Sequence, residues 1–265
     1  MSTDGLKGKW ALILGASSGF GAAAARELAR HGMNIVGVHL DRRAALASVE
    51  ALVKELQSQG GQAHFFNVNA ADAEKRAEIL TQIQPKLGGS PFTVLMHSLA
   101  FGTLKPYVAA DPKEQLTKDQ MEMTLDVMAN SLVYWVQDLL ARKLLAKGSR
   151  IYAMTSSGGT RVWPTYGAVS AAKAALESHI RQLAMELAPL GVTANAIRAG
   201  VTDTPALRKI PGNDQMMEFS KIRNPYKRLT TPEDVAQAIA LLSNSGAGWV
   251  TGNTIGVDGG EDIVG

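Results

Sequence analysis

Short apolar segments alternate with helix-like segments along the whole chain, and this alternation limits the possible folds more than any other feature. Seven segments are rich in β-branched or apolar residues, as strands buried on both faces are. They are residues 10–14, 34–40, 63–68, 92–97, 150–155, 192–197 and 253–257. Strands that alternate with helices pair in parallel through right-handed crossovers. The pattern predicts an α/β Rossmann fold, in which a doubly wound, seven-stranded parallel sheet carries helices on both faces.

The expected helices are marked by the glycines that follow them. The clearest helical segments are residues 22–31, 44–59, 116–147 and 166–188. Gly32, Gly60 and Gly148 follow the first three, and glycine commonly ends a helix because it adopts a left-handed conformation without strain.

Composition narrows the class of protein. With 265 residues and 46% hydrophobic content, the chain can form one large core, so residues 1–265 are expected to be a single domain. The absence of Cys excludes a disulfide scaffold and a Cys nucleophile, and it favours a reducing, cytoplasmic location. The net charge of +3 comes from scattered basic residues, which does not indicate nucleic-acid binding. Neither a membrane-spanning apolar stretch nor a carboxylate cluster typical of a metal site is evident.

A glycine-rich loop follows the first expected strand. Gly15, Gly19 and Gly21 enclose Ser17, Ser18 and Phe20, and an Ala-rich helix begins directly afterwards. Glycines in this place allow a tight turn and a close approach to a pyrophosphate, which is then held at the helix N-terminus. The loop therefore predicts a dinucleotide site, the alternative being a purely structural turn.

The end of the second expected strand bears on the choice of dinucleotide. His39 is nearest the strand end, and Asp41, Arg42 and Arg43 follow. A carboxylate there would bind the ribose diol of NAD(H), whereas an arginine would bind the 2′-phosphate of NADP(H). We favour NADP(H) and leave NAD(H) open. In the alternative interpretation, both arginines are solvated residues of the next helix and Asp41 is its cap.

Tyr166 and Lys173 lie seven positions apart in the last long helical segment. Seven residues make two helical turns, so both side chains point the same way, with about 10 Å of rise between them. Beside a nicotinamide, a phenol and an ammonium form an acid and its electrostatic activator. Such a pair also arises by chance on many helices, so its meaning depends on the surrounding motifs.

These motifs together resemble the short-chain dehydrogenase/reductase family over nearly the whole chain. The glycine loop, Asn67 and Val68, Ser156, the Tyr166/Lys173 helix and the Asp258-Gly-Gly sequence occur in that family's order. The family more often has a Tyr four residues before the Lys, and that position is Val169 here. Ser156 is seventeen residues before Lys173, as in the family, although it also fits a simple turn.

The seven-residue spacing resembles the enoyl-[acyl-carrier-protein] reductase branch of the family. The segments 96–101 and 195–204 are also similar to that branch, and residues 205–212 look closest to a less common type that prefers NADPH. The sequence departs from the best-known members at Ser156, where they often have a second Tyr. The resemblance implies reduction of a 2-enoyl thioester by NAD(P)H in fatty-acid synthesis.

The resemblance also implies roles for particular residues. Tyr166 would hydrogen-bond the developing enolate oxygen, Lys173 would hold the nicotinamide ribose, and Ser156 would orient the substrate or Tyr166. Reducing an enoyl thioester sends hydride to C3 while charge develops on the oxygen at C1, so an acid displaced by one turn suits it. The remaining expected cofactor contacts come from the loops after the other strands: Asn67, Val68, Ser98, Gly200, Val201 and Thr204.

The segment after Thr204, about residues 204–228, is expected to cover the substrate. Its Met216 and Met217 suit a variable acyl chain, although a plain surface helix fits equally well. Basic residues in and beyond it would suit an acidic acyl carrier protein or a CoA phosphate. By family analogy, helices 116–147 and 166–188 are expected to build a homotetramer. The two alternative functions are a carbonyl or alcohol oxidoreductase of the same family and a catalytically silent NADP-binding regulator. His97 is expected to pack rather than to catalyse.

Overall fold

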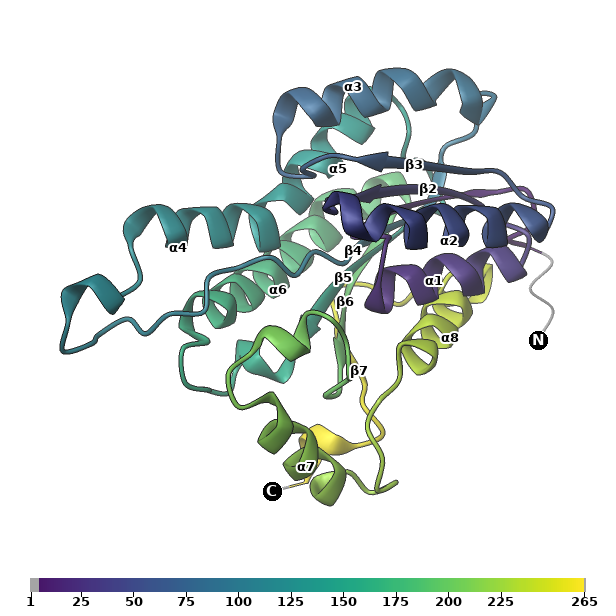
Figure 1. Cartoon of the computed structure of the whole chain (residues 1–265). Coiled ribbons are helices and arrows are strands. Elements are labelled where there is room, and N and C mark those ends of the chain that lie inside the picture. Colours follow the sequence, from purple (N-terminus) through teal and green to yellow (C-terminus); the bar gives the residue numbers. More distant parts are fainter. Residues whose placement is uncertain (1–4, 265) are drawn as a thin grey trace.

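The computed structural model describes residues 5–264, which form a seven-stranded parallel sheet with helices on both faces (Figure 1). The strand order is β3-β2-β1-β4-β5-β6-β7, and every neighbouring pair is parallel. The strands are β1 (Trp10–Leu14), β2 (Asn34–His39), β3 (Ala63–Asn67), β4 (Phe92–His97), β5 (Arg150–Ser156), β6 (Thr193–Ala199) and β7 (Thr254–Val257). The predicted Rossmann fold is confirmed.

Within residues 5–264, eight α-helices cover the sheet or extend from it (Figure 1). They are α1 (Gly19–Arg30), α2 (Leu46–Ser58), α3 (Ala73–Ile83), α4 (Lys118–Leu125), α5 (Ser131–Ala141), α6 (Gly167–Leu187), α7 (Asn213–Arg223) and α8 (Pro232–Leu242). Helices α1, α2 and α8 pack on one face of the sheet, and α3, α5 and α6 pack on the other. Successive residues of β1 point to opposite faces of the sheet. Ile13 packs in the core beneath α1, α2 and α8, and Leu12 packs in the core beneath α3, α5 and α6.

The direction in which successive strands are added reverses between the neighbouring strands β1 and β4. Strands β2 and β3 lie on one side of β1, and β4 to β7 lie on the other. In open α/β sheets, ligands bind at the carboxyl ends of the strands next to such a reversal. The loops after β1, β4, β5 and β6 all lie at this edge, and α7 and the C-terminal turn flank it (Figure 1).

The single helix expected at 116–147 is wrong: the segment is interrupted, and its last helix ends six residues earlier, at Ala141. A capping box at Thr117 starts α4, and a π-helical turn, Asp126–Asn130, separates α4 from α5. Ser131, the first residue of α5, donates from its hydroxyl to the carbonyl oxygen of Val127 in this turn at 2.9 Å. The helix ends at Ala141, and Lys143 follows in a left-handed conformation with φ 58°. The other expected elements differ from the observed ones by a few residues at their ends.

Candidate functional site

The loop between β1 and α1 is packed so tightly that only glycine fits at two of its positions. A Cβ at Gly15, whose φ is 89°, would collide with the backbone carbonyl of Ser98. A Cβ at Gly21 would collide with the carbonyl oxygen of Gly15. Ser18 precedes the helix in an extended conformation, and its side chain makes no capping bond. The first amides of α1 therefore remain available to an anion, which fits a dinucleotide pyrophosphate.

The loops after β4 and β6 complete this part of the site. The Ser98 amide donates to the Leu14 carbonyl oxygen at 2.8 Å, which holds the β4 loop against the end of β1. A Cβ at Gly19 would lie 3.5 Å from Cγ2 of Thr204, so the loop after β6 reaches the glycine loop. Gly200, before Val201, is confined by the Thr230 hydroxyl. Loops that are far apart in the sequence therefore converge on the N-terminus of α1.

The end of β2 is organised by hydrogen bonds around Asp41. His39 is buried, and its Nδ1 lies 2.9 Å from Oδ2 of Asp41. Asn67, at the end of β3, accepts from the Asp41 amide at 2.9 Å and donates to the Asp41 carbonyl oxygen at 3.0 Å. The next residue, Val68, donates its amide to the His39 carbonyl oxygen at 2.7 Å. The predicted residues His39, Asn67 and Val68 therefore lie together, although the imidazole is already bonded to a carboxylate.

Two arginines follow Asp41 at this edge. Arg42 and Arg43 are exposed, and neither has an ion-pair partner among residues 5–264. The alternative interpretation is confirmed in that both arginines are solvated and Arg43 begins the next helical turn, but the Asp41 cap is wrong. Arg42 precedes a short 3₁₀ turn, Arg43–Ala45, and no side chain caps that turn or α2. The site thus presents two unpaired guanidinium groups, which fit a phosphate on the ribose.

Lys173 lies on α6 with its ammonium buried at the end of β5. Its side chain is only 6% exposed, and Nζ donates to the Met154 carbonyl oxygen at 2.6 Å. Burial lowers the pKa of Lys173 to about 8, and the nearby carboxylate of Glu177 partly offsets this effect. Glu177 itself accepts from the Thr155 hydroxyl at 2.7 Å. Sequence reasoning missed Glu177, although its position one helical turn after Lys173 was a usable signal.

Tyr166 is the residue from which α6 starts, and its ring lies beside Ser156. A Cβ at Gly158 would come within 2.5 Å of the Tyr166 ring and 3.2 Å of Ser156 Oγ, so both side chains pack closely against this glycine. Burial raises the pKa of Tyr166, and the Ser156 hydroxyl partly offsets this rise. Ser156 Oγ is buried and makes no hydrogen bond of good geometry within the described residues. The structure thus brings Tyr166, Ser156 and Lys173 to one end of β5.

Val169 occupies the position four residues before Lys173, where the family more often has a tyrosine. Its side chain is buried among Val127, Met128 and Ala172. Valine has no hydroxyl, so this position supplies no acid. Tyr166, one turn earlier, is the hydroxyl-bearing aromatic residue on α6.

A cavity of about 480 Å³ opens next to Tyr166. Its walls come from the loop after β4 and from the segment that enters α6; the lining residues are Lys105, Pro106, Tyr107, Val162, Trp163, Thr165, Tyr166, Gly167, Ser170 and Ala171. Thr165 has φ 63°, a left-handed conformation that strains a β-branched residue. Sequence reasoning missed residues 105–107 and 162–165, because nothing in their pattern shows that the fold brings them to Tyr166.

His97 is buried at the end of β4 and does not face this cavity. Its Nε2 lies 2.9 Å from the Ser131 hydroxyl. Burial and the nearby Lys173 charge lower the pKa of His97 to about 3, so the ring is neutral. The expectation that His97 packs and hydrogen-bonds is confirmed.

The expected covering segment lies at the rim of the cavity. Trp163, a cavity residue, donates from Nε1 to the Pro211 carbonyl oxygen at 3.0 Å. Met216 and Met217 are half-buried, and Phe219 is 65% exposed. None of these three lines the cavity, so the observed packing resembles the alternative of a surface helix.

Most of the basic residues expected to form a docking rim are paired within the chain. Arg208 bonds Asp203, Lys221 bonds Glu218, Arg223 bonds Glu261, and Arg228 bonds Asp234. Lys227 donates to the Ile222 carbonyl oxygen at 2.8 Å. The charge that remains for a partner is therefore smaller than the sequence indicates. Among the described residues, no helix is both long and apolar enough to cross a membrane.

Comparisons with known proteins agree with this geometry. The family model described as enoyl-(acyl carrier protein) reductase matches residues 15–261. The chain is 32% identical over 255 residues to 1-cyclohexenylcarbonyl-CoA reductase of Streptomyces collinus, covering 96% of this chain and 86% of that protein. It is also 30% identical over 258 residues to a 3-oxoacyl-[acyl-carrier-protein] reductase of Pseudomonas aeruginosa, covering 96% and 98%.

A solved structure shows the same fold. The NADH-dependent enoyl-[acyl-carrier-protein] reductase of Aquifex aeolicus superimposes with a TM-score of 0.84 at 26% identity, covering 98% of both chains. The match of the family model to nearly the whole sequence decides the classification. This chain belongs to the short-chain dehydrogenase/reductase family, whose members are NAD(P)H-binding oxidoreductases.

Proposed function

We propose that this protein reduces the C2=C3 double bond of a 2-enoyl thioester, with NADPH as the hydride donor, in fatty-acid synthesis. The observation that carries the proposal is the position of Tyr166. Its phenol lies beside Ser156 at the cavity, while the position usual for the family's tyrosine is filled by the buried Val169.

The displaced phenol suits enoyl reduction because of where charge develops. When hydride reaches C3, electron density moves through C2 to the thioester oxygen at C1. A hydrogen bond from Tyr166 Oη to that oxygen stabilises the enolate, and C2 then takes a proton from water, so that hydride and proton together saturate the C2=C3 bond. In ketone reduction, hydride and proton go to adjacent atoms, so the acid would need to lie nearer the nicotinamide. The bound dinucleotide supplies the hydride.

Lys173 and Ser156 prepare Tyr166 for this role. The Lys173 ammonium, held by Met154, would bind the ribose hydroxyls of the nicotinamide half and favour the ionised phenol nearby. The buried Ser156 hydroxyl, which has no directed bond in the described chain, is free to bond either Tyr166 or the thioester oxygen. On the cofactor side, Val201 and Thr204 would contact the carboxamide.

The preference for NADPH is supported by the bonding of Asp41. NAD(H) selection typically uses a carboxylate at the end of β2, but the last residue of β2 here is His39, and one oxygen of Asp41 is bonded to its imidazole at 2.9 Å. Arg42 and Arg43 are left without ion-pair partners in the described chain, and a 2′-phosphate would supply one.

The activity is tested by mixing the protein with crotonyl-CoA and NADPH and following loss of NADPH absorbance. We expect turnover, and we expect Tyr166→Phe to reduce kcat by about 100-fold or more while the affinity for NADPH is retained. A panel of 2-enoyl thioesters that gives no turnover would contradict the proposal.

A second candidate is ketone reduction, which the 30% identity to a 3-oxoacyl-[acyl-carrier-protein] reductase favours. Acetoacetyl-CoA, assayed beside crotonyl-CoA at equal concentration, separates the two. A higher kcat/KM for acetoacetyl-CoA would replace the enoyl proposal. Tight NADPH binding without turnover of either substrate would indicate a silent regulator.

A further inference from the structure

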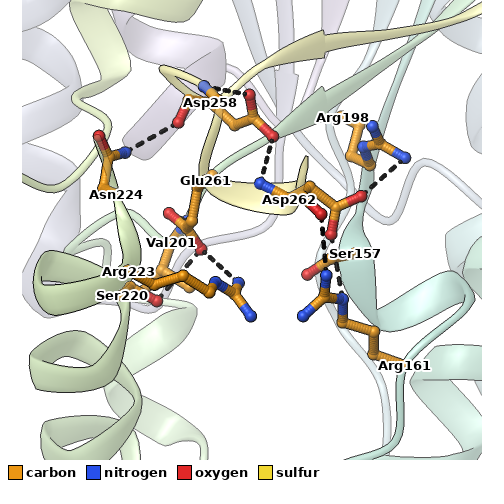
Figure 2. Close-up of polar contacts among 12 residues, drawn as sticks. Ser157, Arg161, Arg198, Val201, Ser220, Arg223, Asn224, Asp258, Glu261 and Asp262 are labelled. Atoms are coloured by element: carbon orange, nitrogen blue, oxygen red, sulfur yellow. Dashed lines mark hydrogen bonds and ion pairs between the residues drawn. The ribbon is translucent and has the colours of Figure 1, made fainter. Parts of the chain in front are cut away.

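A turn at the C-terminal end of the chain joins three segments that surround the candidate site. After β7, Asp258 and two glycines lead into a 3₁₀ turn, Glu261–Ile263. Figure 2 shows the side chains of Asp258, Glu261 and Asp262 at the centre of a network of hydrogen bonds and ion pairs. We call these three residues the C-terminal clasp. None of them was assigned a role above.

Glu261 is the most enclosed member of the clasp, with only 2% of its surface exposed. Its Oε2 accepts from the Val201 amide at 3.2 Å. Its Oε1 accepts from the Ser220 hydroxyl at 3.1 Å and from Arg223 Nη2 at 3.2 Å (Figure 2). Val201 follows β6, whereas Ser220 and Arg223 belong to α7. One carboxylate therefore bonds both the cofactor-side loop and the helix at the cavity rim.

Asp262 extends the network to the segment that leads to Tyr166. Its carboxylate lies 3.1 Å from Arg161 Nε and 3.0 Å from Arg198 Nη1 (Figure 2). Arg161 also donates from Nη2 to the Asp262 carbonyl oxygen at 2.9 Å. Arg161 lies in the loop between Ser156 and Tyr166. This loop therefore contacts Asp262, and α7 contacts the preceding residue, Glu261.

The conformation of the clasp is held by hydrogen bonds to the Asp258 carboxylate and carbonyl oxygens. Asp258 accepts from the Gly260 amide at 3.0 Å and from the Asp262 amide at 3.2 Å. Asn224, just after α7, donates to the Asp258 carbonyl oxygen at 2.9 Å. A Cβ at Gly200 would lie 2.9 Å from Glu261 Oε2, so the loop after β6 approaches the carboxylate as closely as its backbone allows.

Helix α7 depends on this carboxylate because it has little other anchorage. Ser220 is its only buried residue, and Phe219 and Ile222 are 65% and 68% exposed. Its N-terminal side is fixed by the bond between Trp163 and the Pro211 carbonyl oxygen. Its C-terminal side is fixed by Glu261 and, directly after the helix, by the bond from Asn224 to the Asp258 carbonyl oxygen. A short helix with one buried side chain gains little from packing, so the order of α7 follows these polar contacts.

We propose that Glu261 is a positioning residue that couples the order of α7 to cofactor binding through the Val201 amide. The proposal rests on the proposed function only in taking Val201 as a contact of the nicotinamide carboxamide. A cofactor that fixes Val201 also fixes Glu261, and Glu261 then holds Ser220 and Arg223. The coupling is reciprocal, so loss of the α7 contacts weakens cofactor binding.

The test uses the full-length protein and two readouts that need no enoyl turnover. The first is NADPH affinity, measured by the change in protein fluorescence. The second is the rate at which trypsin cleaves α7 after Lys221 or Arg223, with and without NADPH. In the wild type, NADPH slows this cleavage. In Glu261→Gln, which keeps size and removes charge, we expect NADPH affinity to fall about tenfold and the protection by NADPH to disappear.

Arg223→Gln is the second variant, because it removes only the α7 side of the pair and leaves the Val201 bond intact. We expect it to lose protection as Glu261→Gln does, with cleavage scored after Lys221, and the double variant to bind NADPH no worse than Glu261→Gln alone. Glu78→Gln is the control, since Glu78 forms an exposed pair with Lys75 on α3, away from the site. It is expected to behave as the wild type.

Several results would overturn the coupling. They are cleavage of wild-type α7 that NADPH does not slow, protection that survives in both Glu261→Gln and Arg223→Gln, and reduced melting temperature with unchanged NADPH affinity. A protein that fails to reduce enoyl thioesters but shows the expected affinity and protection would contradict the proposed function alone.

Discussion

The Lys173 ammonium donates a hydrogen bond to the Met154 carbonyl oxygen at 2.6 Å, deep at the carboxyl end of β5. Burial lowers the pKa of Lys173 to about 8, from an ordinary value of 10.5. Below pH 8 the lysine is charged in both the folded and the unfolded protein, so its burial lowers the free energy of unfolding by the full amount. Between pH 8 and 10.5 only the unfolded protein keeps the proton, and this destabilisation decreases as the pH rises. The buried ammonium of Lys173, which the site uses, therefore destabilises the fold near neutral pH.

Lys173→Met is expected to raise the free energy of unfolding at pH 7 by on the order of 3 kcal/mol, because it removes the buried charge. The gain over the wild type should shrink as the pH rises from 8 towards 10.5. Urea unfolding of both proteins across this range measures it. Lys75→Met, at an exposed position, should show no such trend, and a constant gain at all pH values would contradict the explanation.

Gly158→Ala is expected to lower kcat by about tenfold or more while NADPH affinity is kept. The new Cβ would lie 2.5 Å from the Tyr166 ring, so the ring must shift from its position beside residue 158. Small displacements of a reacting group have large effects on rate. Gly246→Ala is the matched control, because an added Cβ meets no atom within 4 Å there. Steady-state kinetics of both variants that match the wild type would show that the ring position is not critical.

Arg42→Ala and Arg43→Ala together should weaken NADPH binding by about 10- to 100-fold, since each removes a charged hydrogen bond to phosphate. NADH lacks that phosphate, so its affinity should change by no more than about twofold. Fluorescence titration with each dinucleotide measures both values. Arg26→Ala serves as a control, because Arg26 is paired with Glu55. Equal losses for NADPH and NADH would argue against phosphate recognition.

Ser156→Ala is expected to raise the pKa of Tyr166 further. Burial already raises this pKa, and the Ser156 hydroxyl is the group that lowers it. Ultraviolet titration of Ser156→Ala, with Tyr166→Phe as the reference for the other tyrosines, measures the shift. Phenolate would form at higher pH than in the wild type. A downward shift would mean that Ser156 stabilises the neutral phenol instead.

The fold was largely accessible from sequence patterns. Apolar segments of strand length predicted the seven strands. The glycine-rich pattern predicted the loop after β1, in which Gly15 and Gly21 leave no room for a Cβ. The continuous helix expected at 116–147 was wrong, because hydrophobic periodicity does not show the π turn at Asp126–Asn130 that separates α4 from α5. Asp41 was considered as a helix cap, but its pairing with His39 depends on a strand-end geometry that propensity does not encode.

The sequence by itself determined the order of strands and helices and the one-turn displacement of Tyr166 from Val169, because both are local periodicities along one chain. Only the tertiary structure decided which distant segments meet: Trp163 against Pro211, and Glu261 between Val201 and Arg223. These contacts join residues tens of positions apart. They are set by how the helices and the C-terminal turn pack at one edge of the sheet, which no local pattern specifies.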